Sequence, residues 1–201
     1  ERAPDAERVV FETGPLSVWF NQGLTAEGAP AICIDARHAK AALDMAPNKT
    51  DANDADGLAH LAEVGFFREV RVKGFDSMLT RTLIAARAKL VRITIELSNQ
   101  IRGLMKTFGL VVPRSAGGKF EEHVKRLLAG HDDLGQIILP MLDAWRSMRT
   151  RAAELGRQLI SSARRSETCR LLMSIPGVGA VTATSFATAI EDPANFKKSR
   201  S

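Results

Sequence analysis

The sequence predicts three consecutive parts: a small α/β part, a long antiparallel helical hairpin, and a short all-α segment with a helix-hairpin-helix-like motif. Three observations lead to this prediction. Short apolar runs alternate with helical patterns in the first third of the chain, leucines recur every seventh residue in the middle, and a Pro-Gly-Val-Gly sequence separates two apolar helical patterns near the end. We place the three parts at residues 1–75, 76–166 and 167–201.

The first part contains two predicted strands. The apolar runs RVVFE (8–12) and AICIDA (31–36) are typical of buried strands, and residues 69–72 are a candidate third strand. Helical patterns follow Pro15 and cover residues 51–64, so the order strand, helix, strand indicates a partly parallel sheet. Because this part is short for a complete α/β domain, we expect at least one earlier strand to belong to it.

The middle part carries two heptad patterns, which are typical of helices that pair along a seam. The first seam consists of Leu79, Leu83, Ala86, Leu90, Ile93, Leu97, Gln100 and Leu104, and the second of Leu134, Ile138, Met141, Trp145, Met148, Ala152, Leu155 and Leu159. Pro and Gly in residues 111–119 can reverse the chain, so we predict an antiparallel coiled-coil hairpin; pairing between subunits is the alternative. Pro140 either kinks the second helix or marks its start.

Charge is distributed unevenly along the chain. Residues 1–75 hold 8 Lys and Arg against 12 Asp and Glu, whereas residues 76–201 hold 20 against 11. This asymmetry indicates cation-binding carboxylates in the first part and a surface that attracts polyanions in the rest. No apolar run approaches the roughly 20 residues of a membrane-spanning helix, and no signal-peptide pattern is present. Cys33 and Cys169 lie far apart in apolar surroundings, which is typical of packing residues in a cytoplasmic protein.

The Pro-Gly-Val-Gly sequence is a candidate DNA-binding motif formed by Gly177, Val178 and Gly179. Glycine permits backbone conformations closed to other residues and lets a phosphate group approach closely. The N-terminus of the following helix offers unpaired N–H groups and the positive end of the helix dipole to that phosphate. Such a contact reads the DNA backbone and not the bases. The alternative is a plain packing corner between two helices.

Asp51, Asp54 and Glu12 are the candidate catalytic and metal-binding residues. Asp51 and Asp54 lie three positions apart on a predicted helix and therefore share a face, and Glu12 ends a predicted strand. Together these carboxylates would hold divalent cations, Mg²⁺ or Mn²⁺, which act on both oxygens of a phosphodiester in two-metal sites. The alternative is that the two aspartates only complement the helix dipole. Lys49, just before them, either contacts a phosphate or is solvated.

Four arginines of the first heptad pattern are weaker candidates for nucleic-acid binding. Arg81, Arg87, Arg92 and Arg102 either line a nucleic-acid groove or form the solvated face that is usual for a coiled coil. Asp35 follows the second predicted strand, where a turn residue is the simpler interpretation.

Four strings of the sequence resemble those of a known family. The strings ETG (12–14), AICIDARHAKAAL (31–43), KTDANDADGLAHL (49–61) and SIPGVGAVTATSFATAIEDPANF (174–196) occur in the same order in the DEDD-type insertion-sequence transposases of the IS116/IS110/IS902 family. The resemblance covers almost the whole chain. It implies an RNase H-like domain with four magnesium-binding acids, a coiled-coil middle, and a C-terminal domain with a serine nucleophile. By motif position, Glu12 would match the second acid, Asp51 the third and Asp54 the fourth.

The resemblance also implies binding partners, and it implies that the chain is a fragment of a longer transposase. DNA and an element-encoded guide RNA would bind, and the coiled coil would form a homo-oligomer. The first acid would lie on a strand several dozen residues before Glu12, and the serine well after the glycine turn; Ser199 and Ser201 do not match it. We therefore expect an incomplete RNase H-like part and a chain that is inactive alone. The alternatives are a non-catalytic DNA-binding or oligomerisation module, an inhibitor of an intact transposase, and a pseudogene product without a role.

Overall fold

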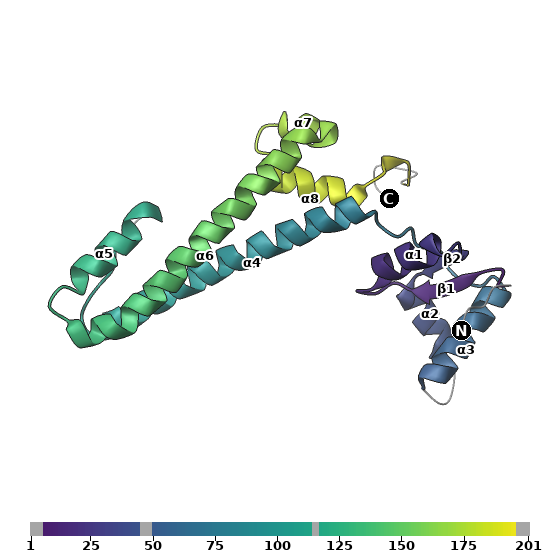
Figure 1. Cartoon of the computed structure of the whole chain (residues 1–201), viewed down its shortest axis with the longest axis horizontal. Coiled ribbons are helices and arrows are strands. Elements are labelled where there is room, and N and C mark those ends of the chain that lie inside the picture. Colours follow the sequence, from purple (N-terminus) through teal and green to yellow (C-terminus); the bar gives the residue numbers. More distant parts are fainter. Residues whose placement is uncertain (1–5, 45–49, 114–116, 196–201) are drawn as a thin grey trace. The chain divides into compact units, whose positions relative to one another are not determined.

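The computed structural model describes residues 6–44, 50–113 and 117–195 (Figure 1). The chain divides into two compact units, unit 1 (Glu1–Asp76) and unit 2 (Ser77–Ser201). Among the described residues, none of the helices combines the length and the apolar composition that crossing a lipid bilayer would require.

Unit 1 is a small α/β arrangement. Strand β1 (Val9–Glu12), helix α1 (Ser17–Ala26), strand β2 (Ala31–Ile34), helix α2 (Ala36–Leu43) and helix α3 (Asp51–Glu63) follow one another in the chain. The two strands pair in parallel, with Val9 opposite Ala31 and Glu12 opposite Ile34. The α/β prediction and the parallel pairing are therefore confirmed.

The core of unit 1 forms where α2 and α3 pack against the sheet. Ile34, Ala39 and Leu61 are buried there, and Val10 and Leu58 pack against them. An Arg8 Nη1 group donates to the carbonyl of Ala62 at 3.0 Å, which places the C-terminal end of α3 beside the start of β1. Leu58, one turn before Ala62, packs against the same core as Val10.

The third predicted strand is reduced to one bridge. Residues 69–72 do not form a strand, and Glu69 makes an isolated antiparallel bridge with Ile34. The Val70 amide donates to the Cys33 carbonyl at 2.8 Å and the Asp35 amide donates to the Arg68 carbonyl at 2.9 Å. The chain thus touches the edge of β2 for only a few residues before α4 begins.

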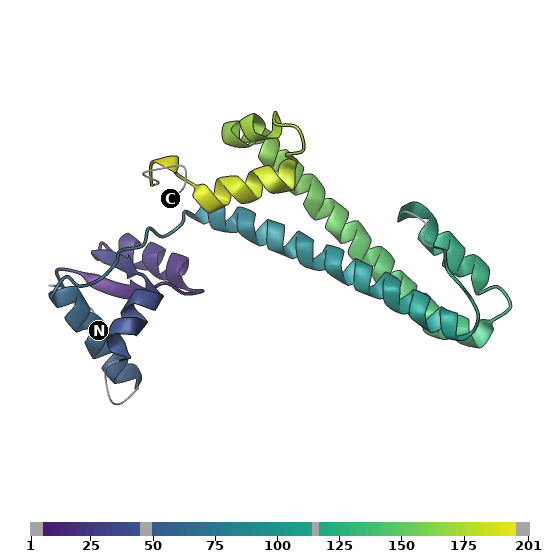
Figure 2. The same cartoon turned by 180° about the vertical axis from the view of Figure 1, so that it is seen from behind.

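Unit 2 is built on two long helices that run in opposite directions (Figures 1 and 2). Helix α4 (Phe75–Thr107) is followed by a short 3-10 turn η1 (Gly117–Lys119), α5 (Phe120–Leu127) and α6 (Asp132–Arg165). Helices α7 (Glu167–Met173) and α8 (Ala180–Ile190) and a 3-10 turn η2 (Pro193–Asn195) complete the described chain. Arg87 of α4 lies against Gly156 of α6, whereas the end of α4 packs against the start of α6. The predicted antiparallel hairpin is therefore present.

The apolar seam follows the prediction on α6 but not on α4. Ile138, Trp145, Ala152 and Leu159 of α6 are all buried. On α4 the predicted seam residues Leu79, Ala86 and Gln100 are exposed, and the fully buried side chains are Ile101 and Met105. The physical reason is that α5 packs on this end of α4 together with α6, so α4 buries a broad helical stripe there and not a narrow heptad seam.

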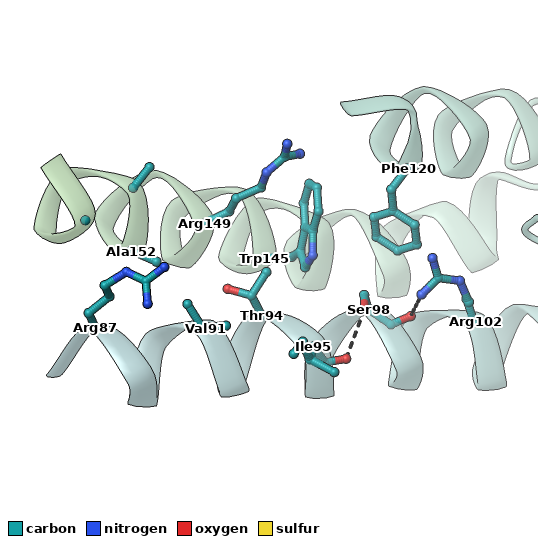
Figure 3. Close-up of a pocket in the computed structure, with 12 residues that line it drawn as sticks. Arg87, Val91, Thr94, Ile95, Ser98, Arg102, Phe120, Trp145, Arg149 and Ala152 are labelled. Atoms are coloured by element: carbon teal, nitrogen blue, oxygen red, sulfur yellow. Dashed lines mark hydrogen bonds between the residues drawn. The ribbon is translucent and has the colours of Figure 1, made fainter. Parts of the chain in front are cut away.

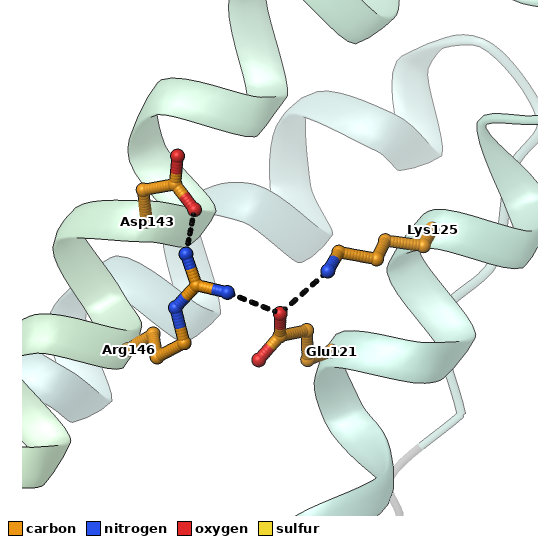
Figure 4. Close-up of polar contacts among 4 residues, drawn as sticks. All are labelled: Glu121, Lys125, Asp143 and Arg146. Carbon is orange, nitrogen blue, oxygen red and sulfur yellow. Dashed lines mark hydrogen bonds and ion pairs between the residues drawn. The ribbon is translucent and has the colours of Figure 1, made fainter.

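Helix α5 is held against α6 by apolar and polar contacts. The Phe120 and Trp145 rings pack against each other, with their centroids 4.9 Å apart and their planes tilted by 57°. At the rim, Glu121 accepts hydrogen bonds from Lys125 Nζ at 2.7 Å and from Arg146 Nη1 at 3.1 Å, and Arg146 also pairs with Asp143 (Figure 4). The Lys125 hydrogen bond, helped by Arg146, holds the pKa of Glu121 below its ordinary value.

Pro140 lies inside α6 and does not mark its start. The helix begins at Asp132, and the proline is exposed in its third turn. A proline lacks the N–H that would bond the carbonyl four residues earlier, which here belongs to the exposed Gln136. Water can solvate that carbonyl, so the helix continues.

The last helices form a second, smaller core. Ala163 of α6, Cys169 of α7 and Ala183 of α8 are buried together. Thr184 and Thr188 are also buried, and each hydroxyl donates to a carbonyl one turn earlier in α8. Small residues on all three helices allow this close packing.

Candidate functional site

Glu12 lies at the carboxyl end of β1, in a turn that two hydroxyl side chains fix. The Thr13 amide donates to the Ile34 carbonyl at 2.9 Å, and the Thr13 Oγ1 accepts from the Ala36 amide at 3.0 Å. Ser17 Oγ donates to the carbonyl of Gly14 at 2.7 Å. The ETG string is therefore a rigid strand-to-helix turn, and it leaves the Glu12 side chain exposed.

Asp35 ends β2 at the same edge of the sheet, because parallel strands place their carboxyl ends together. Its carboxylate accepts from the Arg37 amide at 2.9 Å and thereby caps the N-terminus of α2. This backbone hydrogen bond is the main reason that the pKa of Asp35 lies below its ordinary value, and the Arg37 charge adds to it. Asp35 is thus a capping residue, as the turn interpretation predicted.

Asp51 and Asp54 lie in the first turn of α3. Thr50 caps this turn, and its Oγ1 accepts from the Asn53 amide at 3.2 Å. Asp51 is exposed and Asp54 is half-buried. Lys49 lies outside the described residues.

The three carboxylates supply oxygen donors of the type that Mg²⁺ and Mn²⁺ bind. Among the residues that the structure describes, however, no three His, Cys, Asp or Glu side chains lie close enough together to hold a metal ion. Glu12, Asp51 and Asp54, all of them described, are therefore not gathered into a metal site. Their role stays a prediction.

The Pro-Gly-Val-Gly turn joins α7 to α8. Gly177 has a φ of +84°, a left-handed conformation that favours glycine. The Val178 amide donates to the Ile175 carbonyl at 3.0 Å, and its side chain packs against the small core of unit 2, which anchors the turn. Gly177 and Gly179 remain exposed.

Gly179 is the N-cap residue of α8 and supplies no side-chain cap. The first N–H groups of an α-helix have no partner within the helix, and the helix dipole makes this end positive. An exposed helix start without a capping side chain fits an approaching phosphate group. Arg170 lies on the neighbouring α7, where its Nη1 donates to the Arg164 carbonyl at 3.2 Å and so closes the end of α6.

Two positioning residues of the strand-end turn were not among the predicted site residues. Thr13 and Ser17 hold the turn after β1, and Ser17 also forms a hydrogen bond with Cys33. Burial raises the pKa of the Cys33 thiol, and this hydrogen bond opposes the rise. Hydroxyl residues directly after a predicted strand are the signal that would have identified them.

Comparisons with known proteins cover both candidate sites. A family model for transposases matches residues 2–109, and a model for transposases of the IS116/IS110/IS902 family matches residues 169–201. The chain is 30% identical to the transposase for insertion sequence element IS1111A of Coxiella burnetii, over 96% of the chain and 53% of that protein. It is 25% identical to a probable family 20 transposase of Pseudomonas aeruginosa, over 76% and 47%. The transposase for insertion sequence element IS1328 of Yersinia enterocolitica is also 25% identical, over 76% and 46%. The chain spans about half the length of these relatives.

Proposed function

The chain belongs to the IS116/IS110/IS902 family of insertion-sequence transposases, and on this premise we propose that it forms the acid-bearing and DNA-contacting parts of an enzyme that cuts and joins DNA. The observation that carries the proposal is the placement of the two family matches. One covers the strand end and helix start that carry the acids, and the other covers the glycine turn before α8. The chain alone is proposed to be inactive.

Unit 1 is proposed to be part of an RNase H-like domain in which Glu12, Asp51 and Asp54 are metal ligands. The support is the parallel β1–β2 pair, the turn after Glu12 that Thr13 fixes, and the position of Asp51 and Asp54 in the first turn of α3. Mg²⁺ or Mn²⁺ would supply Lewis-acid stabilisation of the reacting phosphodiester when bound. Lys49 is proposed to contact a DNA phosphate beside these acids.

The catalytic proposal is tested by isosteric substitution in a full-length transposase that carries this sequence. Asp51→Asn and Asp54→Asn each keep the side-chain shape and remove the charge that a cation needs, so we expect transposition to fall below detection for both. Asp56→Asn, on the same helix, is the matched control and should retain transposition. Full activity of either Asp51→Asn or Asp54→Asn would remove that residue from the active site.

The glycine turn of unit 2 is proposed to contact the DNA backbone as a helix-hairpin-helix motif. Gly179→Ser separates this role from a purely structural one. A serine at the N-cap accepts a hydrogen bond from the first turn of α8, so it should raise stability by a few tenths of a kcal/mol. It also occupies an N–H group that the phosphate would use, and we expect duplex DNA affinity to fall roughly threefold to tenfold. Fluorescence anisotropy with labelled duplex DNA measures the affinity, and unchanged binding would contradict the contact.

The hairpin of α4 and α6 is proposed to act as a coiled coil that joins subunits. The support is a group of apolar side chains that the two helices leave exposed in unit 2, namely Leu79 and Ile95 of α4 and Ile137, Leu139 and Ile160 of α6. An element-encoded guide RNA is proposed as a further partner on the strength of family membership alone. A non-catalytic assembly role is the second candidate, favoured because the three acids are not gathered; light scattering that finds only monomers would exclude it.

A further inference from the structure

Helix α4 turns its leucine seam away from α6. The α4 residues that line a cavity against α6 are Arg87, Val91, Thr94, Ile95, Ser98 and Arg102, and Figure 3 shows this side of the helix. Successive residues of an α-helix are rotated by about 100°, which places the predicted seam roughly 100° around α4 from this stripe. This α4 seam consists of Leu79, Leu83, Ala86, Leu90, Ile93, Leu97, Gln100 and Leu104.

The α4 seam stays accessible in the described part of the chain. None of its eight residues is buried: Leu79, Ala86 and Gln100 are exposed, and the others are half-buried. Leu97 and Leu104 pack at the edge of the main core of unit 2. Helix α8 lies on another side of α4, where Ser185 and Thr188 share a pocket with Arg81, Ile84 and Ala85. The seam is therefore an apolar face available to a further helix.

The heptad spacing of the α4 seam fits a second copy of itself. A strict seven-residue repeat is typical of two helices that wind around each other, whereas packing on a globular core needs only a broader stripe. Reversed about its midpoint, the seam coincides with itself, so that Leu79 meets Leu104, Leu83 meets Gln100, Ala86 meets Leu97, and Leu90 meets Ile93. A copy of α4 that runs in the opposite direction is thus complementary along about 38 Å.

The two flanks of the seam favour this antiparallel direction. The flank toward α6 is half-buried or buried, and it consists of Thr80, Arg87, Thr94 and Ile101. The other flank is exposed, and it consists of Thr82, Lys89, Glu96 and Gly103. An antiparallel pair brings the two exposed flanks together. A parallel pair would place each exposed flank against the covered flank of the other copy.

Charge on the exposed flank selects the register. In the antiparallel pair Lys89 lies opposite Glu96 of the partner subunit, and the two-fold symmetry repeats this contact. A shift by one heptad would bring two Lys89 or two Glu96 side chains together, which is unfavourable. Within the chain, Glu96 contacts Arg92 at 3.6 Å with both side chains largely exposed. Such a pair contributes little, so a lysine from the partner subunit can share the carboxylate.

We propose that the α4 seam binds the same seam of a second copy in the antiparallel direction, with Lys89 of each copy paired to Glu96 of the partner subunit. The inference rests on the proposed joining of subunits by the hairpin, and it assigns the helix, the face and the direction. The intramolecular pairing of α4 with α6 stays intact in this dimer.

Two exposed apolar residues of α4 test the face. Leu79 belongs to the seam and is 58% exposed, whereas Ile95 lies outside it and is 54% exposed. Leu79→Asn removes two seam contacts from each dimer, so we expect the dimer Kd of the chain to rise at least tenfold. Ile95→Asn, the matched control, should change the Kd less than twofold. Sedimentation equilibrium measures both, and circular dichroism verifies that each variant is folded.

Charge reversal tests the direction and the register. Lys89→Glu and Glu96→Lys each place like charges opposite one another, so each variant alone should dimerise about tenfold more weakly. A mixture of the two variants restores opposite charges at both contacts and should dimerise as tightly as the parent chain. The double variant Lys89→Glu with Glu96→Lys should also recover the parent Kd. A parallel pair would show neither loss nor recovery, because Lys89 would then lie opposite Thr94.

The outcomes separate this inference from the proposal on which it rests. Dimers that persist in Leu79→Asn, or charge variants that do not recover on mixing, would overturn the antiparallel seam and leave the joining of subunits by another face of the hairpin. A parent chain that stays monomeric at all concentrations would overturn both.

Discussion

Gly177 and Gly103 are two exposed glycines in different backbone conformations. Gly177 has a φ of +84° in the turn before α8, and Gly103 lies in the interior of α4 on an exposed position. A Cβ built on either residue meets no described atom within 4 Å. Any effect of adding a methyl group therefore comes from the backbone and not from crowding.

The two alanine substitutions should have opposite signs. Gly177→Ala forces a side chain into the left-handed region and should lower the free energy of unfolding by about 1–2 kcal/mol. Gly103→Ala removes a glycine from a helix interior and should raise it by about 0.5–1 kcal/mol. Urea denaturation followed by circular dichroism measures both, and shifts of the same sign would contradict the backbone argument.

At the residue scale, the sequence predicted the local role of single residues better than it predicted which distant residues lie close together. The Gly177 turn, the capping role of Asp35 and the burial of both cysteines are local consequences of neighbouring residues, and the structure shows them. Whether Glu12 approaches Asp51 depends on how a helix and a strand about forty residues apart pack together. Spacing along the chain does not contain that information.

At the scale of elements, the ion pairs of Glu121 join α5 to α6. Its side chain is 22% exposed, while Lys125 and Arg146 are each about half exposed at 51% and 53%. Water screens such partly exposed pairs, so we expect Glu121→Gln to lower the free energy of unfolding by only about 0.5–1 kcal/mol near neutral pH.

The effect of Glu121→Gln should depend on pH. Because its partners hold the pKa of Glu121 below the ordinary value, the charged pair stabilises the fold fully above the unfolded-state pKa of about 4.3. This contribution is lost as pH falls through the lower folded-state pKa. The difference between the parent chain and the variant should therefore shrink in acid, as thermal unfolding between pH 3 and 7 will show. Glu122→Gln, the neighbouring position, controls for net charge.

The two long helices show when helix periodicity predicts the buried residues correctly and when it does not. The α6 seam was predicted because its buried side chains Ile138, Trp145, Ala152 and Leu159 all lie on one apolar stripe of the helix. The α4 seam was only partly right, since α5 adds a second partner near Ile101 and Met105. The sequence left Arg87 and Arg102 open between a nucleic-acid groove and a solvated face, and Arg149 joins them in one cavity only through the chain reversal.

At the scale of the whole molecule, unit 2 depends on contacts between distant parts of the sequence. Ile101 and Met105 of α4 share one core with Phe120 of α5 and with Ile138 and Trp145 of α6. These contacts come from apolar side chains on separate helices. The loop after α4 adds the buried Val112 and the partly buried Leu110 to this core, while Phe108 and Val111 are exposed.

Because α4 shares one apolar core with α5 and α6, we expect the helices to stay together without the covalent link at Gly109. Residues 1–109 and 110–201, produced as two separate polypeptides, should reassemble into one complex because the apolar faces remain complementary. A tag on the first piece should co-purify the second in a one-to-one ratio, and Ile101→Asp in the first piece should abolish this recovery. Separate elution of the two parent pieces would show that connectivity, and not complementarity, maintains the hairpin; successful recovery would make the chain a split reporter for association in cells.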